Sequence, residues 1–144
     1  MPLTLATLGK RLRKDIHDIQ KKASETAGLF AQMVVTDLTE ETPVDTSKAL
    51  SNWQSSLDFP NRNQILPHFP GSKGSTEVAS GKKADEISAR ILKSKKVGQI
   101  IYITNNVDYI EDLNDGASKQ AAPHFVETII KVRMLDIPLI YRGR

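Results

Sequence analysis

The stretch Thr42-Pro-Val-Asp-Thr-Ser-Lys-Ala-Leu-Ser-Asn-Trp53 separates a long helix-patterned segment from the shorter elements that follow it. Pro43 lacks an amide hydrogen and disfavours helical angles in the residue before it, so the helix should end at about Glu41. Asp45 or Thr46 is then expected to cap a new short turn by accepting hydrogen bonds from free backbone amides. The stretch therefore predicts a corner in the fold.

After this corner the apolar pattern changes to a period of two. Trp53, Leu57 and Phe59 share one parity, which is the alternation of a half-buried strand. We predict a strand over residues 52–59. Trp53, the only tryptophan of the chain, is expected to anchor the core.

Before the corner, apolar residues recur in steps of three and four, as they do on one face of a helix. They are Leu5, Leu8, Leu12, Ile16, Ile19, Ala23, Ala27, Phe30, Val34 and Leu38. The pattern predicts a long helix within residues 1–41.

Such a helix would be roughly 55 Å long at 1.5 Å per residue. A compact domain of this size has a radius of gyration of about 15 Å. Either the helix breaks, at Gly28, or its N-terminal half protrudes from the body. We expect it to protrude, with Leu5, Leu8, Leu12, Ile16 and Ile19 facing a neighbouring subunit. A helix bent onto its own sheet is the alternative.

Residues 60–81 contain four prolines and glycines in their first twelve positions and show no sustained period. A loop of this length without structure is uncommon in a compact domain, and it is usually functional or disordered. We interpret it as an interaction arm that becomes ordered against a neighbour, with a mobile loop as the equal alternative.

The remaining elements are predicted as a helix over 84–92, a strand over 99–105, a short helix over 107–114, a helix from Pro123 to about Leu135, and an edge strand or extended tail over 136–144. Both faces of the second strand are apolar, which is typical of a central strand. Tyr109 and Leu113 should face inward, and Gly116 should follow the end of their helix. The whole pattern predicts one α+β domain over 1–144, in which a long N-terminal helix accompanies a small, mainly antiparallel sheet and short helices.

The composition excludes several classes of protein. The chain has no cysteine, so it has neither a disulfide framework nor a thiolate metal site. No apolar run approaches the roughly 20 residues that cross a bilayer, and the N-terminus lacks a signal-type apolar core, so we expect a soluble chain without membrane contact. The net charge of +3 is small, but basic residues cluster at 10–14, at 93–96 and at the C-terminus. These clusters are read as solvated faces or as contacts with phosphate or acidic subunits.

No catalytic, cofactor or metal site is predicted. His17, His68 and His124 are scattered over three predicted elements without the spacing of metal ligands. No serine lies in a nucleophile-elbow pattern, and residues 71–74 lack the strand and the residue order of a phosphate-binding loop. Asp45 is expected to be a cap rather than one of a pair of catalytic carboxylates. We therefore do not expect an enzyme.

Two blocks of sequence carry a resemblance. The turn at residues 42–53 and a later segment, Ile-Tyr-Ile-Thr-Asn-Asn-Val-Asp-Tyr-Ile-Glu-Asp-Leu-Asn-Asp-Gly-Ala-Ser-Lys-Gln-Ala-Ala-Pro, resemble the small neck and tail-completion proteins of tailed phages, the lambda Z-like group. The matching residues are Pro43, Val44, Asp45, Thr46, Trp53, Asn105, Asn106, Tyr109, Leu113, Gly116, Ser118, Gln120 and Pro123, and Thr42 precedes them. Ser47 stands where the group usually has glycine, and Asp108 stands where proline is common.

The resemblance implies a structural virion protein, assembled in the host cytoplasm, that completes the tail and joins it to the head-side connector. It further implies a homo-oligomeric ring, expected to be a hexamer, with other neck and tail proteins as partners and with DNA close by in the channel. The protruding half of the helix and residues 60–81 are the surfaces expected to make its contacts. We also expect the Tyr109 hydroxyl to reach the turn at Asp45, which would join the two blocks. A tail-terminator subunit and a DNA-contacting accessory protein are the alternatives.

Overall fold

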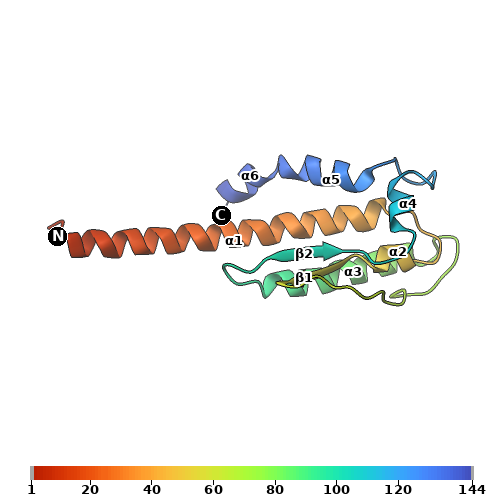
Figure 1. Cartoon of the computed structure of the whole chain (residues 1–144), viewed down its shortest axis with the longest axis horizontal. Coiled ribbons are helices and arrows are strands. Elements are labelled where there is room, and N and C mark those ends of the chain that lie inside the picture. The colour runs from red at the N-terminus through yellow and green to blue at the C-terminus, as the bar shows by residue number, and fades with distance from the viewer. Residues whose placement is uncertain (1, 144) are drawn as a thin grey trace.

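One long helix, α1 (Leu5–Glu41), runs along the molecule, and every other element packs around its C-terminal half (Figure 1). The computed structural model describes residues 2–143. The elements that follow are α2 (Lys48–Ser51), β1 (Gln54–Leu57), α3 (Glu77–Lys93), β2 (Ile101–Thr104), α4 (Ile110–Asn114), α5 (Phe125–Met134) and α6 (Ile137–Arg142). The predicted α+β class is confirmed, although most of the ordered backbone is helical.

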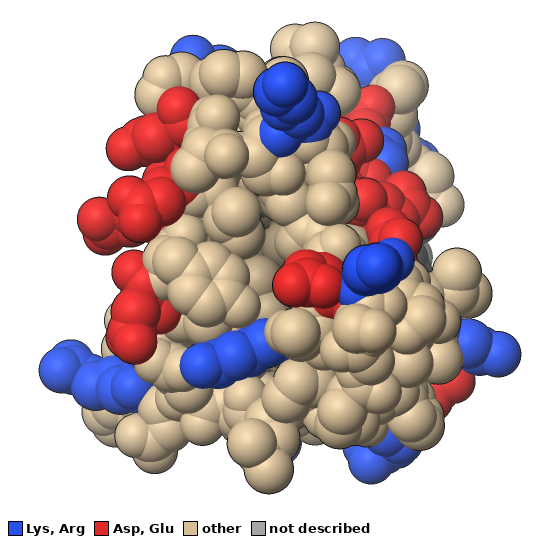
Figure 2. All heavy atoms as spheres, turned by 90° about the vertical axis from the view of Figure 1, so that its right-hand side faces the viewer, with Lys and Arg blue, Asp and Glu red and all other residues tan. Residues whose placement is uncertain are grey.

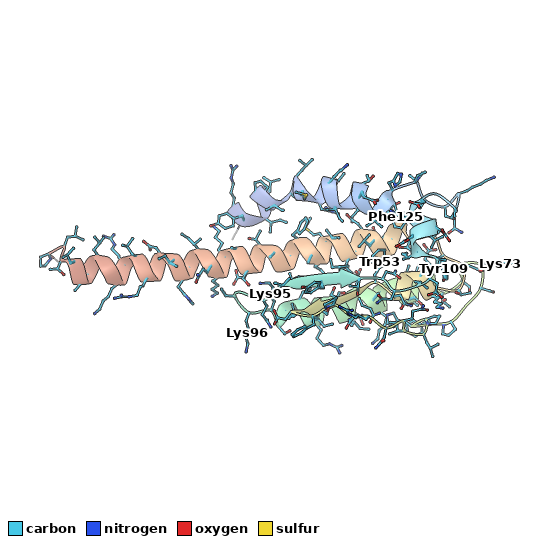
Figure 3. All side chains as sticks on the ribbon, viewed as in Figure 1. Trp53, Lys73, Lys95, Lys96, Tyr109 and Phe125 are labelled. Carbon is cyan, nitrogen blue, oxygen red and sulfur yellow. The ribbon has the colours of Figure 1, made fainter. Side chains whose placement is uncertain are left out.

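Three layers form the body. Helices α5 and α6 lie on one side of α1, and the sheet with α3 lies on the other (Figure 1). The core joins α1 to α5 at the level of the corner, where Trp53 and Phe125 lie close to the C-terminal end of α1 (Figure 3). Its buried members are Val34, Leu38, Trp53, Phe125 and Ile129.

The C-terminal end of α1 is fixed by Thr42. The helix ends at Glu41, as Pro43 predicts. The backbone N–H and the side-chain hydroxyl of Thr42 both donate to the Leu38 carbonyl. The same hydroxyl oxygen accepts a hydrogen bond of 2.7 Å from Nε1 of Trp53. Trp53 is 7% exposed, so its predicted place in the core is confirmed.

The N-terminal part of α1 extends beyond the body without a break. Thr4 and Thr7 bond reciprocally as a capping box at its start. The break considered at Gly28 does not occur, because this glycine lies in the helix and faces α3. A Cβ there would lie 3.7 Å from the Leu92 carbonyl oxygen. The 37 residues of α1 span roughly 55 Å.

The sheet is smaller than predicted. Its two strands pair antiparallel with Gln54 opposite Thr104 and Leu57 opposite Ile101. Within residues 2–143 the sheet has two strands, so the prediction that the second strand is central was wrong. One apolar face of this strand packs against α1, and no third strand pairs with it within residues 2–143.

The prediction that Phe59 continues the buried face of the first strand was also wrong. Phe59 is 80% exposed. The strand ends at Leu57, and the next residue, Asp58, turns the chain with a φ of 67°. Its carboxylate accepts from the Ile100 backbone N–H and from the Gln99 amide, and its own N–H donates to the Ile100 carbonyl.

The segment predicted as a loop over 60–81 is shorter and is held by the body. Helix α3 begins at Glu77, earlier than the predicted start at residue 84. The loop before it bonds to buried polar side chains at the end of α2: the C-cap residue Asn52 exchanges two hydrogen bonds with Ile65, and Ser51 accepts from the His68 backbone N–H. The segment therefore does not need a neighbour to become ordered. The spacing of apolar residues could not reveal that the loop is held by the body, because polar groups make the contacts.

The C-terminal segment differs from prediction in two ways. Helix α5 begins at Phe125, two residues after Pro123, because His124 adopts a φ of 60° at the N-cap. The predicted edge strand or tail is the helix α6. Pro138 does not prevent this helix, because it lies in the first turn, where its missing amide hydrogen has no helical partner.

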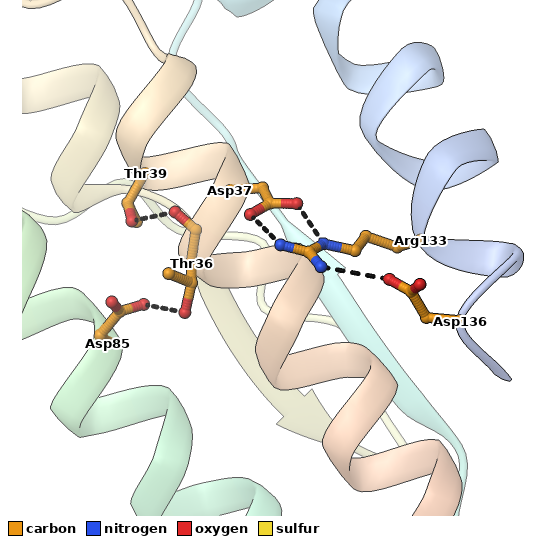
Figure 4. Close-up of polar contacts among 6 residues, drawn as sticks. All are labelled: Thr36, Asp37, Thr39, Asp85, Arg133 and Asp136. Carbon is orange, nitrogen blue, oxygen red and sulfur yellow. Dashed lines mark hydrogen bonds and ion pairs between the residues drawn. The ribbon is translucent and has the colours of Figure 1, made fainter. Parts of the chain in front are cut away.

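Adjacent residues of α1 bond to both flanking layers (Figure 4). The Arg133 guanidinium on α5 pairs with the Asp37 carboxylate through two contacts of 2.5 and 2.8 Å, and it also reaches Asp136 at 3.1 Å. On the other side, the Thr36 hydroxyl donates to the Asp85 carboxylate of α3 at 3.1 Å. These bonds fix the order of the layers around α1.

Replacing Trp53 with alanine should lower the free energy of unfolding by roughly 3–5 kcal/mol, because it leaves a cavity in the core. The matched control is Phe59→Ala, which removes an exposed ring and should change stability by less than about 0.5 kcal/mol. Urea unfolding followed by circular dichroism measures both. Equal losses for the two variants would contradict the assigned core.

Asp85 gives a pH-dependent prediction. Burial raises the pKa of its carboxyl, against the lowering effect of the Thr36 hydrogen bond. The folded state therefore holds the proton more tightly than the unfolded state. The resulting stability is present below the unfolded pKa of about 3.9 and is lost as the pH rises through the folded pKa.

Asp85→Asn keeps the Oδ1 acceptor for Thr36 and removes the charge. We expect it to unfold at higher urea concentration than the parent at pH 7, and the difference should vanish towards pH 3. Glu86→Gln, at an exposed neighbouring position, is the control and should show no such gain. A variant that is less stable than the parent at pH 7 would show that the charge itself contributes to folding.

Candidate functional site

The two blocks that carry the resemblance meet at the end of the molecule where α4 lies. Residues 43–49 line one side of a hollow of about 300 Å³, and Tyr109, Leu113, Ser118 and Gln120 line the other. More than fifty residues of sequence separate the two sides. The motif residues therefore form one spatial unit, which we call the turn hollow.

Amide side chains join the two sides of the turn hollow. Oε1 of Gln120 accepts from the Val44 backbone N–H at 2.9 Å, and its Nε2 lies 3.5 Å from the Val44 carbonyl oxygen. Nδ2 of Asn105 donates to the Ala49 carbonyl at 2.8 Å. We expected the Tyr109 hydroxyl to connect the two blocks, but Gln120 and Asn105 make this connection instead.

Tyr109 nevertheless lies beside the turn, with its ring near the α4 end (Figure 3). Partial burial raises the pKa of its phenol, and the negative charge of Asp45 raises it further. The phenol therefore stays protonated at neutral pH.

Asp45 and Thr46 do not cap α2, so that prediction was wrong. The N-cap position is Ser47, which makes no capping bond through its side chain. The Asp45 carboxylate accepts from the Lys73 backbone N–H at 2.7 Å, and its carbonyl accepts from Gly74 at 2.9 Å. Asp45 thus holds the loop before α3 against the turn, while Thr46 is exposed.

Ser47 has a φ of 66°, a left-handed conformation that glycine adopts without strain. Here the serine is buried, and its hydroxyl shares a hydrogen bond of 2.9 Å with the Thr76 hydroxyl. This contact is a second link between the turn and the loop before α3.

The segment 116–123 is shaped by Gly116, which follows α4 as predicted. Its φ is 98°, and an added Cβ would lie 2.9 Å from Cγ of Pro123. Two residues later, the Ser118 hydroxyl accepts from the Gln120 backbone N–H at 3.2 Å. The spacing of these residues directs the Gln120 side chain towards Val44.

The second candidate surface is the exposed part of α1, residues 5–19, which we call the N-terminal rod. It projects beyond all other described elements (Figure 1). Its apolar stripe is uncovered: Leu5 is 89% exposed, and the later members Leu8, Leu12, Ile16 and Ile19 are between 39% and 57% exposed. The predicted protrusion of the helix from the body is confirmed.

A third surface was not anticipated from the sequence. A groove of about 710 Å³ runs along α1 between β2 and α5. Residues of α1 form its floor, with the small residues Ala23, Ser24, Ala27 and Ala31 among the larger Phe30, Val34 and Leu38. Its walls include Ile101 and Ile103 of β2 together with Val126 and Ile130 of α5. The change from leucine and isoleucine to alanine at Ala23 and Ala27 was a signal for the part of the groove nearer to the rod.

The charged ends of the molecule differ. Lys95 and Lys96 lie where the rod leaves the body (Figure 3), and Nζ of Lys95 donates to the Ser24 hydroxyl at 2.7 Å. At the opposite end, α4 and its C-cap carry Glu111, Asp112 and Asp115. Figure 2 shows this end, where both acidic and basic side chains surround mostly uncharged surface.

The three histidines remain apart. His17 is exposed on α1, and His124 lies 4.0 Å from the Asp115 carboxylate. Burial and the charge of Lys83 lower the pKa of His68. Within residues 2–143, no three His, Cys, Asp or Glu side chains are grouped to hold a metal ion. Over the same residues no helix combines the length and apolar character that a membrane span requires.

The remaining motif residues serve the body. Thr42 and Trp53 form the corner, Pro123 contacts the Gly116 turn, and Nδ2 of Asn106 donates to the Asn61 carbonyl at 3.0 Å. No family model, curated protein or solved structure matches the chain.

Gly116→Ala should destabilise the protein more than Gly98→Ala. Both glycines have positive φ, of 98° and 87°, so each substitution should cost about 1 kcal/mol for the backbone alone. Gly98 has nothing within 4 Å of the added Cβ, whereas at Gly116 the Pro123 ring is in the way. Overpacking should add about 1–3 kcal/mol there.

Urea unfolding of the two variants measures this difference. Equal costs would mean that the ring of Pro123 moves away freely, and that the turn does not depend on its contact with Gly116.

Proposed function

We propose that this chain is a non-enzymatic structural subunit of the neck or tail of a tailed phage. In this role it completes the tail and joins it to the head-side connector as a homo-oligomeric ring. The observation that carries the proposal is that the two blocks of the resemblance build one turn hollow. A chance likeness of two short motifs gives no reason for their side chains to bond to each other.

The N-terminal rod supports a role in assembly. A soluble monomer rarely leaves a continuous apolar stripe uncovered, and such a surface is typical of a contact with another protein. Burying one leucine or isoleucine contributes about 1.5–3 kcal/mol. Five such side chains along the rod therefore favour association strongly.

A ring of identical subunits closes through heterologous contacts, in which each copy uses two different surfaces. The rod is one such surface. The segment 59–69 adds the exposed side chains of Phe59, Leu66 and Phe69, which support its proposed role as a second contact region. The sixfold number and the site in the virion, reached by assembly in the host cytoplasm, come from the resemblance.

The basic residues of the rod favour a DNA-contacting role as the second candidate. Residues 5–19 carry four lysines and arginines against two aspartates, and Lys21 and Lys22 follow. DNA binding through these residues would weaken steeply with salt, in proportion to the phosphates neutralised. A tail-terminator subunit would share the location, but it would bind the end of the tail tube alone.

Native mass spectrometry of the purified protein, alone and with tail tubes or head connectors, tests the proposal. We expect a ring, with six as the expected number of copies, that binds both tubes and connectors. Leu12→Gln with Ile16→Gln should abolish the ring, because it interrupts the apolar stripe with good helix formers. Lys14→Gln with Lys21→Gln on the opposite face is the matched control and should leave it intact.

The other outcomes separate the alternatives. Binding to tube ends alone would favour a terminator. Salt-sensitive binding to duplex DNA by a monomer, lost in the lysine variant and kept in the apolar one, would favour the DNA-contacting role. A monomer that binds none of these partners would overturn the proposal.

A further inference from the structure

We propose that the groove along α1 is occupied by the N-terminal rod of a second copy of this chain. The inference deepens the proposed assembly and rests on it in one respect, namely that copies of the chain meet. It names the two surfaces that form the contact.

Rod and groove cannot meet within one chain. The rod ends at Ile19, and the groove floor begins at Gln20 on the same helix. Because α1 is unbroken, the rod and the groove floor are consecutive parts of one helix, and the rod cannot fold back into the groove. A rod that fills the groove must therefore come from another molecule.

The two surfaces have complementary side chains. The rod presents large residues, such as Leu8, Leu12 and Ile16. The half of the groove floor nearer to the rod presents small residues, among them Ala23 and Ala27, and the far half includes Phe30, Val34 and Leu38. Large side chains on one helix and small ones on another let the two axes approach to about 8 Å. The groove has α1 below it and apolar walls from β2 and α5 on its two sides, so a helix in it would contact all three elements.

The lengths also agree. At 1.5 Å per residue, the rod is about 21 Å long from its first to its last stripe residue. The groove floor extends over residues 20–38 of α1, or about 27 Å. The whole stripe of one rod therefore fits into one groove.

A second copy is favoured over an unrelated apolar helix because every copy of this chain exposes both surfaces, the apolar stripe of the rod and the apolar groove. Contact between copies therefore covers both at once, and large exposed apolar surfaces are typical of protein–protein contacts. Charge does not oppose this contact: residues 5–19 carry four lysines and arginines and two aspartates, and residues 20–143 carry fifteen basic and fifteen acidic side chains.

A small ligand fits the groove less well. Ligand sites combine apolar walls with polar groups that converge on the ligand. The polar side chains of this groove, Gln20, Ser24, Lys95 and Gln99, lie at the end where the rod emerges, and two of them already bond to each other. The rest is an open apolar channel, as a helix requires.

Engineered cysteines test the contact directly, because the chain has none of its own. Leu12→Cys would be combined, in separate variants, with Ala23→Cys, Ala27→Cys or Ala31→Cys. Within one chain each pair is at least about 16 Å apart along the helix, whereas a disulfide needs Cα atoms within about 7 Å. Any disulfide between the two positions therefore joins two molecules.

We expect mild oxidation to give at least tenfold more cross-linked product in one or more of these variants than in matched controls. The controls carry Lys14→Cys, on the opposite face of the rod, with the same three partners. Circular dichroism checks that every variant folds. A second variant, Ala27→Phe, fills the groove from inside and should lower the oligomer fraction tenfold or more without loss of helix.

The form of the product separates this inference from the proposed function. A ladder that closes at the ring size supports both. A dimer that goes no further supports the rod in the groove and overturns the ring. A ring by mass that gives no cross-link above the controls, and that Ala27→Phe leaves intact, overturns the rod in the groove and leaves the proposed function standing. Cross-linking to a different protein alone, or a monomer in every measurement, also overturns the inference.

Discussion

The body depends on the hydroxyl of Thr42, which connects the end of α1 to Trp53 in the core. It donates to the last turn of α1 through the Leu38 carbonyl and accepts from the indole of Trp53. Both groups are buried, so each bond is made where water could not replace it. The indole then packs against Phe125 and Ile129 from the far end of the chain. One side chain thus links the end of the helix, the start of the sheet and the C-terminal layer.

Local chemistry made the helix boundaries at this joint predictable. Pro43 stops α1, the steps of three and four define its buried and exposed face, and Gly116 follows α4 with positive φ. The missed features depend on polar contacts between distant residues. Ser51, Asn52 and Ser80 hold the loop before α3, and no apolar period marks them. Phe59 was misplaced because Asp58, and not the hydrophobic pattern, ends the strand.

The candidate site was predicted in part for a similar reason. The motif residues did converge, but the partner of the turn is Gln120 and not the more conspicuous Tyr109. The groove escaped sequence reasoning because alanine and leucine count alike in an apolar stripe. The spacing of the apolar residues shows which face of α1 is apolar. Whether other elements cover that face or leave a groove over it depends on where β2 and α5 lie.

The absence of a break at Gly28 has a mechanical consequence. A helix held on both sides by Thr36 and Asp37 cannot pivot inside its own body, and within α1 no flexible joint separates the free segment from the held one. A partner that binds the free segment therefore sets the orientation of the whole molecule, because the segment and the body move as one rigid unit. A few degrees of tilt at the grip become several ångströms of travel at the opposite end.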